Sequence, residues 1–99
     1  ALARFGDSVA AILPGLTLGE LHPLIDGERV TCLAGPLGDG RAIAACGVGA
    51  GVDPLLVTAL AEGEGTEPAA LARLSEATAK RALWMRDQWR EIEADYGRR

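Results

Sequence analysis

The clearest pattern of hydrophobic and polar residues lies in the last third of the chain, where apolar residues recur at steps of three and four. This spacing places them on one side of an α-helix. Thr66, Glu67 and Pro68 are typical of a helix start, and Gly97 is typical of a helix end. We therefore predict a long amphipathic helix over residues 67–96. Its apolar stripe comprises Leu71, Leu74, Thr78, Ala82, Met85, Trp89, Ile92 and Tyr96.

The length of this helix gives a first indication of function. From Pro68 onward it would span about 43 Å at 1.5 Å per residue, whereas a compact chain of 99 residues has a diameter of roughly 33 Å. The stripe stays apolar to its far end, so its last residues need a further surface to cover them. We therefore predict a homodimer, with another protein as the alternative partner. The alternative is an elongated monomer in which the first two helices pack along the whole length of this one. The predicted interface comprises Trp84, Met85, Trp89, Ile92 and Tyr96.

Two shorter helical elements are predicted near the start of the chain. Residues 1–13 form an amphipathic helix whose apolar face contains Leu2, Phe5, Val9 and Ile12. Thr17 and Glu20 then have the spacing of a capping box. Pro23 prevents a long continuation, so we predict only a short helical turn over residues 18–22.

Residues 24–48 allow two interpretations. Asp26 and Asp39 can each cap a helix, which gives two short helices. Each aspartate is also followed by glycine, and Asp-Gly is typical of a tight β-hairpin turn, which gives a β-meander. Because the flanking segments hold few β-branched or aromatic residues, we favour helices. The predicted fold is accordingly all-α: one domain of residues 1–99, in which short helices pack on the long C-terminal helix. The alternative is an α+β fold with a short β-meander in residues 28–48.

Asp53 and Pro54 predict one more helix, which ends at Gly63. Together with the preceding residues, the segment Ala44–Gly63 locally resembles the helix-turn-helix of the lactose repressor family. The resemblance is carried by Gly51, Val52, Val57 and Leu60. It implies a regulator as a further hypothesis. The residues that would face a DNA groove do not include the Arg, Lys, Asn or Gln that read base edges, which argues against nucleic acid as a partner. They are Leu55, Leu56, Thr58 and Ala59.

The composition of the chain limits the classes of partner that it can bind and bears on its cellular location. The formal net charge of −4 argues against partners that need a basic face, such as nucleic acids and anionic membranes. No stretch reaches the roughly 20 apolar residues of a membrane span. With no visible signal peptide, we predict a cytoplasmic protein, and the Ala, Gly and Arg content suggests a bacterial one. We expect Cys32 and Cys46 to be buried as small hydrophobic residues in a reducing environment, and whether they pair stays open.

The sequence contains no metal-binding or cofactor-binding signature, and we predict no metal and no cofactor. Candidates for catalysis are limited to His22 and nearby Glu20, since a histidine beside a carboxylate can transfer protons near neutral pH. This pair supports a second hypothesis: a small cofactor-independent enzyme of bacterial secondary metabolism, resembling a cyclase or isomerase. It would require an apolar pocket between helices of about 300 Å³ or more, into which polar groups converge.

Overall fold

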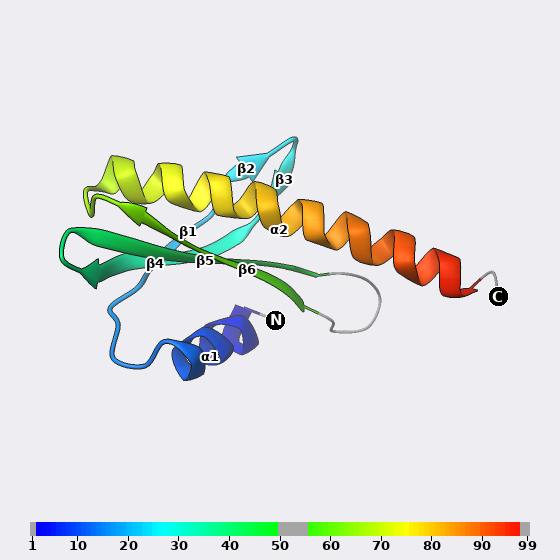
Figure 1. Ribbon diagram of the computed structural model, residues 1–99, viewed down its shortest axis with the longest axis horizontal. Coiled ribbons are helices and arrows are strands. Elements are labelled where there is room, and N and C mark those ends of the chain that lie inside the picture. The colour runs from blue at the N-terminus through cyan, green and yellow to red at the C-terminus, as the bar shows by residue number, and fades with distance from the viewer. Residues whose placement is uncertain (1, 50–55, 98–99) are drawn as a thin grey trace.

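A computed structural model describes residues 2–49 and 56–97, which fold into three layers (Figure 1). Strands β1, β4, β5 and β6 form an antiparallel sheet in the order β1-β4-β5-β6, and β2 pairs with β3 separately. Helix α2 crosses one face of the sheet and α1 lies on the other. The bounds are α1 Leu2–Ile12, β1 Gly19–Leu21, β2 Leu24–Ile25, β3 Glu28–Arg29, β4 Thr31–Gly38, β5 Arg41–Gly49, β6 Leu56–Glu64 and α2 Pro68–Gly97.

The all-α prediction is wrong, because most of the middle of the chain is sheet. The helical turn predicted over residues 18–22 is strand β1, and the two helices favoured for residues 24–48 are strands β2 to β5. The helix-turn-helix predicted for Ala44–Gly63 is also wrong, since its two ends belong to β5 and β6. The start of that predicted second helix, at residues 53–55, lies outside the described residues.

Strand β5 shows why the sequence pattern pointed to helix. It is buried from Ala42 to Val48, because both of its faces are covered. Cys46 belongs to the core cluster beneath α2, whereas Ala45 packs with Phe5 and Val9 of α1 on the other face. A strand that is buried on both faces reads as a continuous apolar run without alternation. Small residues such as alanine suit it because α2 then packs close to the sheet.

The Asp-Gly pairs form the hairpin turns of the alternative β-meander. Asp26 and Asp39 have φ values of 49° and 54°, and the glycines after them have φ values of 82° and 74°. Positive φ at both central residues is typical of type I′ turns, whose twist matches that of the flanking strands. One turn joins β2 to β3, and the other joins β4 to β5. The observed sheet is larger than the predicted meander, since it also includes β1 and β6.

Cys32 and Cys46 lie directly opposite each other on β4 and β5 and form a disulfide. Both side chains are fully buried in the cluster between the sheet and α2, as expected from the sequence, but they are bonded to each other. Their sulfur atoms lie 3.7 and 3.4 Å from the backbone carbonyl oxygen of Ser75 on α2. The disulfide therefore joins two neighbouring strands at the point where the helix crosses them.

Helix α2 packs on the sheet through small side chains and then continues beyond it. Ser75, Thr78, Ala79 and Ala82 are buried, and small residues at these positions let the helix approach the strands closely. Figure 1 shows the last turns of α2, in orange and red, extending past the ends of β5 and β6. The molecule is correspondingly elongated, with extents of 49 × 27 × 19 Å. Neither helix in the described part of the chain is long and apolar enough to cross a membrane.

Candidate interaction surface

The last turns of α2, residues 86–97, are termed the α2 tail. Four of the seven large hydrophobic side chains that are exposed among the described residues come from positions 84–96 of this helix, and the other three are scattered over α1, β2 and β6. The exposed fractions are 44% for Trp89, 46% for Ile92 and 75% for Tyr96. Such a concentration of exposed apolar surface on one element is typical of an interaction site.

The predicted apolar stripe of α2 divides where the sheet ends. Before the tail, Thr78 and Ala82 are buried, and Leu71 and Leu74 are half-buried. Met85 is the last stripe residue that packs against the core cluster. From Trp89 onward the same helical face is exposed, so one continuous stripe is covered by the chain's own sheet in its first part and left open in its second.

The five predicted interface residues do not share one face of α2. Met85, Trp89, Ile92 and Tyr96 follow one another at steps of four, three and four. We term this set, which begins one residue before the α2 tail, the tail stripe. Trp84 is 62% exposed, but at about 100° per residue it lies roughly a third of a turn away from the tail stripe. The structure therefore groups four of the five residues and places Trp84 beside them.

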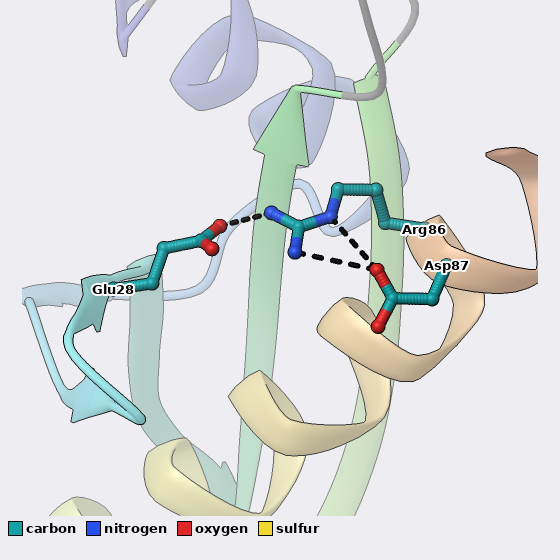
Figure 2. A network of polar contacts seen from close by, with 3 residues as sticks. All are labelled: Glu28, Arg86 and Asp87. Carbon is teal, nitrogen blue, oxygen red and sulfur yellow. Dashed lines mark hydrogen bonds and ion pairs between the residues drawn. The ribbon is translucent and has the colours of Figure 1, made fainter.

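A polar network fixes α2 where the tail begins. Figure 2 shows the Arg86 guanidinium between Glu28 of β3 and Asp87 of α2. Its Nη1 donates to Glu28 Oε2, and its Nε and Nη2 both donate to Asp87 Oδ1 at 3.4 Å. The hydrogen bond to Glu28 is the main cause that raises the pKa of Arg86 above its already high ordinary value. This contact could not be predicted from the sequence, because its two partners lie 58 positions apart.

The predicted catalytic residues Glu20 and His22 do come together, at the surface. Glu20 Oε1 lies 3.2 Å from His22 Nε2, and the two side chains are 50% and 43% exposed. Glu20 belongs to β1 and His22 follows it, so the two residues lie on the same side of an extended segment. A hollow of about 190 Å³ beside β1 is lined by Glu20 and not by His22.

Other hollows also lack the properties that the enzyme hypothesis requires. One of about 240 Å³ lies beside α1 and has an entirely apolar set of lining residues, including Val9, Leu13 and Leu33. Another of about 390 Å³ is lined by charged residues, but all of its lining residues, Arg90, Glu91, Ala94 and Asp95, come from one exposed helix. None of these three hollows combines enclosure with converging polar groups.

Metal-binding side chains do not cluster either: no group of three or more His, Cys, Asp or Glu residues is placed to hold an ion within residues 2–49 and 56–97. Most of the large exposed hydrophobic side chains in the described structure thus lie on or just before the α2 tail. No protein-family model, no curated protein and no solved structure matches the chain.

Proposed function

We propose that this protein is a protein-interaction module that acts as a homodimer through the α2 tail. The observation that carries the proposal is the helix that leaves its own sheet while keeping an apolar stripe, with Trp89, Ile92 and Tyr96 exposed. Exposed aromatic residues in water are costly, and tryptophan and tyrosine are the residues that contribute most to protein interfaces. A second copy of the same tail covers them without requiring any other partner.

The proposed interface has a centre and a rim. Trp89 and Ile92 lie at its centre, Met85 joins it to the chain's own core, and Trp84 contributes at the rim. The tail comprises only about three helical turns. Two tails therefore bury less than the roughly 1,600 Å² of a standard stable interface. We expect a reversible dimer with a dissociation constant in the micromolar range.

The test is sedimentation velocity over a concentration series. The wild-type protein should shift from monomer to dimer as its concentration rises into the high micromolar range. Trp89→Glu places a charge at the centre of the interface and should keep the protein monomeric at every concentration. Ala94→Glu adds the same charge to the same tail on the opposite side of the helix and should dimerise as the wild type does. A wild-type monomer at the highest concentrations would overturn the proposal.

The cytoplasmic location predicted from the sequence also remains a proposal, and the disulfide bears on it. Bonds such as Cys32–Cys46 are maintained mainly in oxidising compartments, because the cytoplasm keeps thiols reduced. The test is to alkylate free thiols while the cells that naturally produce the protein are lysed, and then to identify the modified cysteines by mass spectrometry. Modified cysteines support a cytoplasmic location, whereas an intact disulfide contradicts it.

A further inference from the structure

We propose that the two tails pair antiparallel, about a two-fold axis that passes between Arg90 and Glu91. This inference rests on the proposed homodimer and specifies its geometry. It follows from the spacing of the tail stripe, the distribution of charge along α2 and the point at which the sheet ends.

The spacing of the tail stripe is the same in both directions. The steps from Met85 to Trp89, Ile92 and Tyr96 are four, three and four. An antiparallel pair centred between Arg90 and Glu91 therefore places Met85 opposite Tyr96 of the second copy, and Trp89 opposite Ile92. Every apolar residue of one stripe then meets an apolar residue of the other. Steps of three and four are also the spacing with which helices pack side by side in coiled coils.

The charges of the tail favour the same direction. The first half of the tail is balanced in charge, since Arg86 and Arg90 are offset by Asp87 and Glu91, whereas the second half carries only the acidic Glu93 and Asp95. An antiparallel pair brings the acidic half of each tail to the balanced half of the other, so that the two acidic halves stay apart. A parallel pair would instead bring the two acidic halves together, which is unfavourable for like charges.

The end of the sheet fixes the register. With this centre, the tail of the second copy ends opposite Trp84 and Met85, which is where the chain's own core stops covering α2. A shift of one heptad toward the sheet would require Tyr96 of the second copy to reach Thr78, which is buried. A shift of one heptad the other way would leave only Ile92 and Tyr96 paired. The proposed register alone covers the whole exposed stripe.

A distance between two spin labels tests this geometry. Arg73 is exposed on α2 far from the tail, and the two native cysteines of the chain are joined in the disulfide. Arg73→Cys therefore provides a single labelling site. In the antiparallel pair the two labels are separated by 35 residues of helical rise, or about 50 Å. In a parallel pair they lie side by side, less than about 30 Å apart, given interaxial distances of 8–10 Å.

Pulsed electron–electron double resonance on the spin-labelled protein at high micromolar concentration should give the longer distance. Adding Trp89→Glu to the labelled variant should abolish that signal. A shorter distance that is also lost in Trp89→Glu overturns the antiparallel inference but leaves the homodimer standing. If the labelled protein that keeps Trp89 gives no dipolar signal, both the antiparallel geometry and the homodimer are overturned.

Discussion

Close packing at the centre of the molecule depends on individual small residues. Gly35 on β4 is buried, and a side chain there would overlap the backbone carbonyl oxygen of Thr17. On the other face, the Ser75 carbonyl lies against the two disulfide sulfurs. A larger residue at Gly35 would force the segment that contains Thr17 away from the sheet, and a larger residue at Ser75 would force α2 away from it. Residues that look unremarkable in the sequence thus determine how tightly the three layers pack.

We predict that reduction of the Cys32–Cys46 disulfide lowers the free energy of unfolding by about 3 kcal/mol, the loss expected for a closed loop of about 15 residues. The two cysteines are 14 positions apart. Urea denaturation of the wild-type protein with and without reductant measures the difference. The double variant Cys32→Ala and Cys46→Ala is the control, because reductant should not change its midpoint. Equal midpoints for oxidised and reduced wild type would show that the bond does not stabilise the fold.

At the scale of elements, the sequence predicted the helices far better than the strands. The periodic segments at the two ends are α1 and α2, since each has one buried face and one exposed face. Strand β5 has no exposed face, so its run of small apolar residues carried no period of two. The Asp-Gly turns were the one local signal for hairpins, and they competed with the helix-capping properties of aspartate.

Strand β6 also carries a pattern that is typical of a strand. Val57 and Ala59 point toward α2 and are buried, whereas Leu60, Glu62 and Glu64 are exposed. This partial alternation is typical of a strand with one open face. Asp53 and Pro54 predict a helix start in front of β6, but a capping signal does not determine the structure of the residues that follow it.

The contact between α2 and the β2–β3 hairpin gives a prediction at the same scale. Glu28→Gln removes the charge that Arg86 binds and should lower the free energy of unfolding by about 1 kcal/mol, as expected for a charge-assisted hydrogen bond near the surface. Thermal or urea denaturation measures the loss. Glu20→Gln, which alters an exposed pair, is the matched control and should change stability by less than about 0.5 kcal/mol.

The direction of the shift in the pKa of Arg86 sets the pH dependence of its contact with Glu28. A raised pKa means that the contribution of Arg86 is fully present below the ordinary pKa of arginine and is lost only as the pH rises through the raised value. The difference in stability between the wild type and Glu28→Gln should therefore stay constant from neutral to mildly alkaline pH. Equal stabilities at neutral pH, or a difference that disappears in mild alkali, would contradict this assignment.

At the scale of the whole molecule, one quantity could be predicted without the correct fold. The length of α2 follows from the sequence pattern alone, and any compact body of this size leaves its end uncovered, whether that body is a sheet or a bundle. The division of the stripe at Met85 could not be predicted in this way. It depends on where β5 and β6 end, and the sequence pattern predicts helices in place of those strands.

The central claim is that the α2 tail is protected only by association, and hydrogen exchange measured at several protein concentrations tests it most directly. A short helical end without tertiary contacts frays. Backbone amides of residues 89–96 should therefore exchange rapidly in dilute protein and slow markedly as the concentration rises. Amides of β4 and β5, which pair within one chain, should exchange equally slowly throughout. Tail amides whose exchange rate does not depend on concentration would contradict the account.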